Sequence, residues 1–285
     1  MERIKTGIIG VGHLGKIHLN CLKNIPTVDV IGFYDSDPVT AREVEQKQSV
    51  RKYSSEQELL SVCDAVDIVA PTTMHYELAM DAMRQGKHVF LEKPITATLQ
   101  QSQQIVSYAK EHNLKVQVGH VERFNDAFLA AKQYLNNPLF IETHRLAEFN
   151  PRGTDVSVVL DLMIHDIDIV LNIIKSPVKR ISANGVAVIS DTPDIANARI
   201  EFENGATANL TASRISLKKM RKMRVFQPNA YITMDFLEKQ ANIMQLRDYV
   251  PEDDNELLSL VLDMGDNKGK KRIFIESPHN EKVNA

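Results

Sequence analysis

The chain has 285 residues, of which 43% are hydrophobic and 25% are charged, and its formal net charge is −3. This composition is ordinary for a globular protein, and the length leaves room for two domains. The weakly acidic charge argues against nucleic acid and anionic membranes as main partners, so a small molecule is the expected ligand.

Neither a membrane span nor a signal segment is predicted. No run approaches the ~18 apolar residues that a span requires, and no apolar leader stands before the first strand. We therefore expect a cytoplasmic protein. Cys21 and Cys63 lie within apolar patterns, so we expect two buried thiols, with neither a disulfide nor a metal site.

A glycine-rich turn follows the first predicted strand, which spans residues 4–9. The segment Gly10-Val11-Gly12-His13-Leu14-Gly15 has the G-x-G-x-x-G spacing of dinucleotide-binding turns. Gly10 permits the tight turn, Gly12 lets a pyrophosphate approach the backbone, and Gly15 allows the following helix to pack on the strand. The free N–H groups at the start of that helix would bind the phosphates.

The second predicted strand, residues 28–34, ends at Asp35, which is twenty residues after Gly15. An acidic side chain at this position accepts hydrogen bonds from the ribose diol of an adenosine. Ser36 and Asp37 follow it in place of an arginine, so a ribose 2′-phosphate would meet negative charge. The sequence therefore predicts a dinucleotide site, with a plain glycine-rich turn as the alternative, and it favours NAD over NADP as the dinucleotide.

Strands and helices continue to alternate to about residue 120. This rhythm predicts a Rossmann-type, doubly wound parallel sheet, with ligands bound beyond the carboxyl ends of its strands. We assign residues 1–120 to an NAD-binding domain. The further expected elements are helices at 13–23, 40–48, 55–62, 76–85 and 98–112 and strands at 66–70, 88–91 and 115–118.

Two loops at the ends of these strands are expected to face the cofactor. Pro71 and Thr72 follow one strand, and the turn Glu92-Lys93-Pro94 follows the next. His75 opens the helix after the first loop, where it would either contact the cofactor or act as a capping or packing residue. Lys93 offers a cation that stabilises charge on an alcohol oxygen as it becomes a carbonyl, with a surface lysine as the alternative.

Residues 121–285 have a different pattern, with short β-rich runs separated by turn signals. They predict an α+β domain built on a mostly antiparallel sheet, which would bind substrate. The expected elements are helices at 125–136 and 158–174 and strands at 140–149, 181–188, 196–202, 207–213, 224–227, 231–236 and 271–275.

The predicted helix 158–174 carries ionisable residues on one side. At ~100° per residue, Asp161, His165 and Asp168 form a narrow stripe, whereas Asp166 lies outside it. Apolar neighbours flank this stripe closely, which favours a cleft over a solvent-facing surface, although a buried structural His–Asp pair would give the same pattern. Histidine is the side chain best suited to take a proton near neutral pH.

Together these motifs resemble the glucose-fructose oxidoreductase and inositol dehydrogenase family, written Gfo/Idh/MocA. The resemblance implies an NAD-dependent dehydrogenase acting on CH–OH groups. It implies that Lys93 polarises the hydroxyl oxygen, that His165 is the general acid/base, that Asp161 orients the sugar or the imidazole, and that Asp168 supports them. The cofactor-binding residues that it implies are Gly10, Gly12, His13, Leu14, Gly15, Asp35, Pro71, Thr72, His75, Glu92 and Lys93.

Within the family, the runs 119–125 and 144–152 are similar to the branch that oxidises nucleotide-activated amino sugars, such as UDP-N-acetylglucosamine at C3. Arg123 and Arg152 would then meet a diphosphate or a uronate, with surface salt bridges as the alternative. The basic run 218–224 would either meet the same anion or form a solvated face. The resemblance also implies a homodimer or homotetramer formed through the open face of the antiparallel sheet.

Two other functions stay open from the sequence. One is an NAD-bound ligand sensor without turnover, but a sensor has no need for the combination of Lys93, Asp161 and His165. The other is a reductase of a non-sugar substrate such as a tetrapyrrole. Four charged residues favour a polar substrate over that alternative, namely Glu122, Arg123, Arg145 and Arg152.

Overall fold

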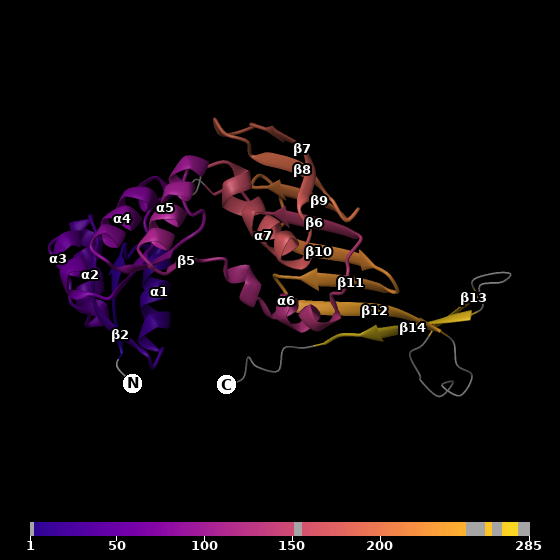
Figure 1. The fold of residues 1–285 in the computed structure, drawn as a ribbon, viewed down its shortest axis with the longest axis horizontal. Coiled ribbons are helices and arrows are strands. Elements are labelled where there is room, and N and C mark those ends of the chain that lie inside the picture. Colours follow the sequence, from indigo (N-terminus) through magenta and orange to yellow (C-terminus); the bar gives the residue numbers. More distant parts are fainter. Residues whose placement is uncertain (1–2, 151–155, 249–259, 264–269, 279–285) are drawn as a thin grey trace. The chain divides into compact units, whose positions relative to one another are not determined.

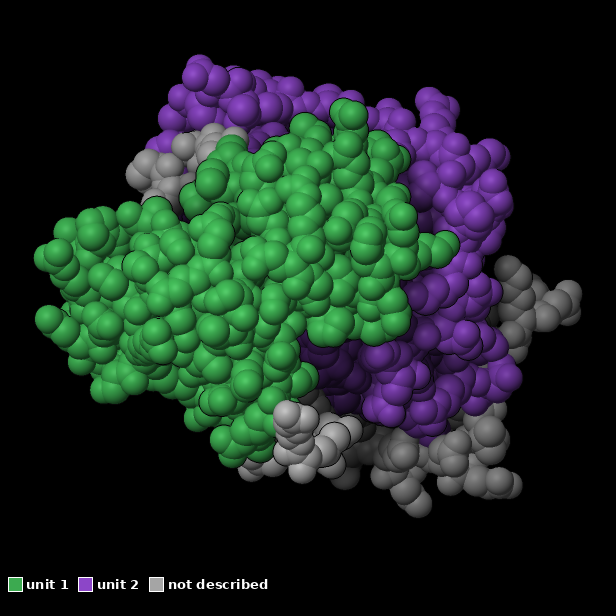
Figure 2. All heavy atoms as spheres, turned by 60° about the vertical axis from the view of Figure 1, so that its left-hand side comes forward, with its two compact units in different colours: residues 1–119 green, residues 120–285 purple. Residues whose placement is uncertain are grey.

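A computed structural model describes residues 3–150, 156–248, 260–263 and 270–278 of the chain. The chain divides into two compact units, residues 1–119 and residues 120–285, which Figure 2 colours separately. None of the helices in the described residues combines the length and the apolar character of a membrane span.

The first unit is a five-stranded sheet in the order β2-β1-β3-β4-β5, in which every described pairing is parallel. This confirms the predicted doubly wound sheet. The strands are β1 (Ile4–Ile9), β2 (Val28–Tyr34), β3 (Ala65–Ile68), β4 (His88–Leu91) and β5 (Val116–Val118). The helices are α1 (His13–Lys23), α2 (Pro38–Gln48), α3 (Glu56–Val62), α4 (Thr72–Arg84) and α5 (Leu99–Glu111) (Figure 1).

Both faces of this sheet are covered by helices. Ile8 packs with Leu19 of α1 and Val44 of α2 on one face, whereas Ile9 belongs to a separate core with Leu59 of α3 and Ile105 of α5. Burial on both faces explains why these strands read as continuous apolar runs in the sequence. The strand order reverses beside β1, and such a switch point opens a crevice beyond the strand ends.

Side-chain caps determine where several helices of the first unit begin. Asp37 accepts hydrogen bonds from the backbone N–H groups of Val39 and Thr40 at the start of α2. Ser55 and Thr98 cap α3 and α5 in the same way. Each such cap contributes about 1 kcal/mol and satisfies donors that the helix leaves open.

The second unit is a nine-stranded sheet in the order β13-β14-β12-β11-β10-β6-β9-β8-β7, antiparallel except for the β6–β9 pair (Figure 1). Its strands are β6 (Phe140–Leu146), β7 (Val178–Val186), β8 (Ile195–Phe202), β9 (Thr207–Ser213), β10 (Met220–Gln227), β11 (Ala230–Asp235), β12 (Gln240–Asp248), β13 (Leu260–Asp263) and β14 (Lys270–Glu276). The α-helices are α6 (Asp126–Ala131) and α7 (Ile164–Ile173), and the short helical turns are η1 (Val121–Phe124), η2 (Lys132–Tyr134) and η3 (Val159–Met163).

One face of this sheet carries the core of the second unit. Phe128 of α6 and Val170 of α7 share a single apolar cluster with sheet residues such as Ile141 and Val225. Along β6, residues alternate between buried and half-buried positions, so Glu142 and the residues in step with it lie on the opposite face. That opposite face is free of helices among the described residues (Figure 1).

Several predicted boundaries in the second unit were wrong. The predicted strand 140–149 ends at Leu146, and the predicted helix 125–136 is α6 followed by the 3₁₀ turn η2. The predicted helix 158–174 begins with a π-helical turn, η3, before α7. The strands β12 and β13 were not predicted; in β12 the buried residues Ala241 and Ile243 alternate with polar ones, which hides the strand in a polar segment.

The prediction of two buried thiols was wrong for Cys21. Cys63 is buried, but Cys21 is exposed, and both thiols are free. The buried side of α1 is formed by Gly15 and Leu19. Cys21 follows Leu19 by two residues, or about 200° around the helix, and therefore faces away from the core.

Candidate functional site

A cavity of about 380 Å³ lies at the carboxyl ends of β1 and β3, where the strand order reverses. Its lining comes from the ends of three strands, the loops that follow them, and the helices α3 and α4. The lining residues are Ile9, Gly10, Gly12, Tyr34, Asp35, Ser36, Glu56, Val69, Ala70, Pro71, Met74 and Leu78. The residues predicted for a dinucleotide thus include four that surround one crevice, Gly10, Gly12, Asp35 and Pro71.

The three glycines of the turn differ in what their missing side chains permit. A Cβ at Gly10, whose φ is 91°, would lie 2.5 Å from the carbonyl oxygen of Val69, and a Cβ at Gly15 would lie 2.0 Å from the carbonyl oxygen of Gly10. Both positions therefore require glycine. A Cβ at Gly12 would meet no described atom within 4 Å, so open space adjoins the backbone at the N-terminus of α1. That space suits a phosphate group; His13 and Leu14 are exposed beside it.

The carboxylate of Asp35 is held by backbone groups at the edge of this cavity. Its Oδ2 atom accepts a hydrogen bond of 2.7 Å from Val11 N, and its Oδ1 atom accepts one of 2.8 Å from Asp37 N. Each carboxylate oxygen has capacity for a further hydrogen bond. Asp35 therefore fastens the glycine turn and can still accept from a ribose diol.

Lys93 occupies the turn after β4, and the Lys93–Pro94 peptide bond is cis. His75 is 1% exposed, and its ring nitrogens lie 2.9 Å from the carbonyl oxygens of Pro94 and Ala70. His75 thereby ties the loop after β3 to the Lys93 turn. This geometry matches the packing alternative, and a direct contact between His75 and the cofactor stays a prediction. Thr72 is buried at the start of α4.

A charged cluster beneath the Lys93 turn was missed by the sequence analysis. His18 Nδ1 lies 2.9 Å from Asp67 Oδ2, and His18 Nε2 lies 3.3 Å from Glu92 Oε1. Hydrogen bonds to Asp67 and Glu92 raise the pKa of His18 to about 10. The available signal was Asp67 itself, a carboxylate inside a strand of the predicted doubly wound sheet, because such strands are covered on both faces and a buried carboxylate requires a partner.

In the second unit, Asp161 lines a cavity of about 410 Å³. Two cationic side chains, Arg214 and Lys219, line the same cavity with Ala147, Glu148, Phe149, Asn150 and Leu162. Arg214 forms an ion pair with Asp194 at 2.9 Å, whereas Lys219 is exposed and lies 3.9 Å from Glu148. The cavity therefore combines the predicted Asp161 with positive charge from the start of the predicted basic run 218–224.

The other members of the predicted stripe have different surroundings. His165 is half-buried in the first turn of α7. Asp168 forms a bidentate pair with Arg123, with contacts of 2.7 and 2.6 Å, and lies 3.8 Å from His120. In this structure Arg123 therefore forms a salt bridge, which was the alternative to a substrate contact, and the hydrogen bonds with Asp168 raise the pKa of Arg123. Arg152 lies outside the described residues.

Arg145 and Glu122, which the sequence analysis used as evidence for a polar substrate, are both buried and form an ion pair with each other. Arg145 is 2% exposed and contacts Glu122 Oε1 at 2.9 Å and Asp166 Oδ1 at 2.8 Å. Burial opposes the charge on Arg145, but the charges of Asp166 and Glu122 raise its pKa overall. This cluster joins η1, β6 and α7 inside the second unit. In the sequence, the feature that pointed to it was Asp166, which lies outside the predicted stripe.

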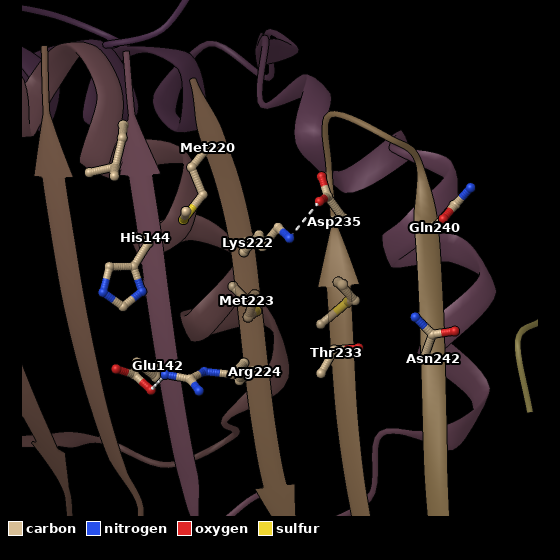
Figure 3. Close-up of a pocket in the computed structure, with 12 residues that line it drawn as sticks. Glu142, His144, Met220, Lys222, Met223, Arg224, Thr233, Asp235, Gln240 and Asn242 are labelled. Atoms are coloured by element: carbon tan, nitrogen blue, oxygen red, sulfur yellow. Dashed lines mark hydrogen bonds and ion pairs between the residues drawn. The ribbon is translucent and has the colours of Figure 1, made fainter. Parts of the chain in front are cut away.

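A third cavity, of about 570 Å³, lies on the helix-free face of the large sheet (Figure 3). Glu142, His144, Lys222, Arg224 and Asp235 project into it from β6, β10 and β11. Lys222 is 3.2 Å from Asp235, and Arg224 pairs with Glu142, so both basic residues have acidic partners.

Within the described residues, no group of three or more histidine, cysteine or acidic side chains is placed to hold a metal ion.

Known proteins share both units. Residues 4–120 match the family described as an oxidoreductase family with an NAD-binding Rossmann fold, and residues 133–233 match the GFO/IDH/MocA C-terminal domain. The chain is 36% identical over 244 residues to UDP-N-acetylglucosamine 3-dehydrogenase of Acidithiobacillus ferrooxidans, covering 85% of this chain and 77% of that protein. It is 28% identical over 236 residues to scyllo-inositol 2-dehydrogenase (NAD(+)) of Bacillus subtilis, covering 75% and 68%.

Solved structures agree with these relatives. The UDP-N-acetylglucosamine 3-dehydrogenase structure from Acidithiobacillus ferrooxidans superposes with a TM-score of 0.80, covering 85% of this chain and 80% of that one. The scyllo-inositol dehydrogenase of Lactobacillus casei with bound NAD(H) and scyllo-inositol, 23% identical, shares the fold with a TM-score of 0.73 over 82% and 76% of the two chains. With both units matched in order, the chain belongs to the Gfo/Idh/MocA family of NAD-dependent oxidoreductases.

Proposed function

We propose that this chain transfers a hydride between a secondary alcohol of a sugar nucleotide and NAD, and that its substrate is a UDP-N-acetylhexosamine oxidised at C3. The observation that carries the substrate is the 36% identity to a protein named UDP-N-acetylglucosamine 3-dehydrogenase. The Asp161 cavity supports it through the exposed Lys219 in its lining, because a sugar nucleotide carries a diphosphate; Arg214 in the same lining is buried in its pair with Asp194.

We assign cofactor binding to residues 1–119, with NAD on the glycine turn. The open space beside Gly12 and the free N–H groups of α1 suit the pyrophosphate, and the fixed carboxylate of Asp35 suits the ribose diol. When bound, NAD supplies the hydride acceptor. His13, Leu14, Thr72 and the Glu92–Lys93 turn are further candidate contacts.

We assign substrate binding to residues 120–285 together with Lys93. His165 would take the proton of the substrate hydroxyl as the carbon that bears this hydroxyl is oxidised to a ketone, and NAD would supply the acceptor for the hydride of that carbon. Lys93 stabilises the negative charge that develops on the oxygen, and Asp161 orients the sugar or the imidazole. Arg123 and Arg152 are candidate contacts to the diphosphate; Arg123 would have to exchange its pair with Asp168.

The test follows NADH formation with NAD and a panel of UDP-sugars and free polyols. We expect turnover with a UDP-N-acetylhexosamine, and a loss of ~10² to 10⁴-fold in kcat for Lys93→Ala and His165→Ala. Lys110→Ala, at an exposed lysine of α5, is the matched control and should match the wild type. NAD binding in calorimetry without turnover of any panel member would favour the sensor alternative, and turnover of a non-sugar alone would favour the reductase.

We further propose a homodimer or homotetramer formed through the helix-free face of the large sheet. Phe140, Phe226 and Tyr231 form a line of ring contacts there, with centroids 5.9 and 4.8 Å apart, and Phe226 is 38% exposed. Light scattering should report a dimer or larger for the wild type and a smaller particle for Phe226→Asp; a monomeric wild type would contradict this proposal. The cytoplasmic location stays a prediction from the sequence.

A further inference from the structure

The ring of His18 joins three elements of the first unit. It projects from α1 and lies between Asp67 of β3 and Glu92 at the end of β4, at 2.9 and 3.3 Å. Its side chain is 15% exposed, and those of the two acids are 4% and 10% exposed. The ring also forms a T-shaped contact with the ring of Phe90, with centroids 5.9 Å apart. The cluster is therefore largely shielded from water.

The ring must carry a positive charge to satisfy both neighbours. Each of its nitrogens faces a carboxylate, and only the imidazolium form donates from both nitrogens at once. Burial raises the pKa of Asp67, and its Oδ1 atom has no hydrogen-bond partner among the described residues. The charge of Asp67 thus depends on His18, which supplies the compensating charge in this cluster.

Glu92 connects this cluster to the Lys93 turn. Its Oε2 atom accepts a hydrogen bond of 3.1 Å from the backbone N–H of Lys93, while its Oε1 atom faces His18. A Cβ at Gly119 would lie 2.6 Å from the same Oε1 atom, so the carboxylate is enclosed on that side by backbone. Motion of the Glu92 carboxylate would therefore move the backbone of Lys93.

We propose that His18 is a positioning residue for Lys93: it holds the Glu92 carboxylate, which in turn holds the backbone of the lysine turn. The inference rests on the proposed catalytic role of Lys93. Because His18 belongs to α1, whose N-terminus follows the glycine turn, it also links the dinucleotide-binding helix to the lysine turn. The buried cation thus connects the lysine turn to this helix, while the glycine turn keeps its own backbone contacts.

Steady-state kinetics of His18→Gln, Glu92→Gln and the double variant test this coupling. We expect kcat to fall by about 10- to 100-fold in each single variant, because small displacements of a catalytic group have effects of this size. The double variant should be no slower than the poorer single variant, since both changes release the same carboxylate. The KM for NAD should change by less than about threefold in His18→Gln, because the glycine turn is intact.

The variant Leu19→Ala distinguishes the positioning role of His18 from a purely structural role of α1. Leu19 is fully buried in α1 beside His18, and its loss should lower Tm while kcat stays near the wild-type value. If the losses of kcat in His18→Gln and Glu92→Gln multiply, or if Leu19→Ala loses as much kcat as His18→Gln, the inference is overturned. Wild-type kcat in His18→Gln would overturn it as well.

A second measurement needs no turnover. In protein labelled with ¹⁵N-lysine, the backbone amide signal of Lys93 should shift in His18→Gln in the same direction as in Glu92→Gln, because the hydrogen bond to Glu92 weakens in both. An unchanged amide signal in His18→Gln would refute the positioning role. If the amide shifts but the wild type turns over no substrate, the proposed function fails while the link from His18 to Lys93 stands.

Discussion

Replacing Arg145 with methionine is expected to destabilise the second unit strongly. Methionine is apolar and unbranched like the stem of arginine, but it leaves Glu122 and Asp166 without their buried cation. The guanidinium contacts these carboxylates at 2.9, 3.1 and 2.8 Å, and both acids are less than 10% exposed. Arg221 is a second cation near Glu122, at 3.6 Å.

The magnitude follows from burial. Removing one partner of a buried ion pair costs about 3–5 kcal/mol, because a charge is left uncompensated in a poorly solvated place. A typical domain has a free energy of unfolding of about 5–15 kcal/mol, so the loss of Arg145 would remove a large share of it. The cation–π contact of Arg145 with Phe236, at 5.9 Å, adds a smaller contribution.

Urea unfolding followed by circular dichroism measures this change, with Arg123→Met as the matched control. The Arg123 side chain is 42% exposed in its pair with Asp168, so its loss should reduce the free energy of unfolding by only about 0–1 kcal/mol. Adding Glu122→Gln and Asp166→Asn to Arg145→Met should restore part of the loss, because no charge is then stranded. An equal effect of Arg145→Met and Arg123→Met, or no recovery in the triple variant, would refute the reasoning.

Three further outcomes are expected. Gly15→Ala should weaken NAD binding in calorimetry by at least ~10-fold, because its Cβ would lie 2.0 Å from the carbonyl oxygen of Gly10; unchanged affinity would contradict the tight turn. Asp35→Asn should lower the preference for NAD over NADP roughly tenfold in kcat/KM, because a negative charge next to the 2′-phosphate is removed; an unchanged ratio would assign selectivity to other residues. The pKa of His18 is raised to about 10 from its ordinary 6.5, so its contribution to stability is complete below about pH 6.5 and is lost as the pH rises through 10. The difference in unfolding free energy between wild type and His18→Gln should therefore shrink from pH 7 to 10, and a constant difference would show that the ring is not held charged.

Local patterns in the sequence determined much of the first unit. The predicted bounds of β1, β2 and β4 agree with the observed strands, because parallel strands covered on both faces appear as unbroken apolar runs. The glycine spacing predicted the dinucleotide turn for a similar reason: a Cβ at Gly15 would meet the carbonyl oxygen of Gly10, five residues earlier, and Gly10 itself has a positive φ of 91°. In both cases the residues that determine the structure lie close together in the sequence.

Only the tertiary structure decided how the buried charges are paired. His18 meets Asp67 from 49 residues away, and Arg145 meets Glu122 and Asp166 from 23 and 21 residues away. Spacing along the chain carries no information about such partners, because the sheet order and the helix packing bring them together. The stripe predicted on the helix therefore pointed to Asp168, whereas burial selected Asp166 for the core; a charge is retained inside a protein where the fold supplies its counter-charge.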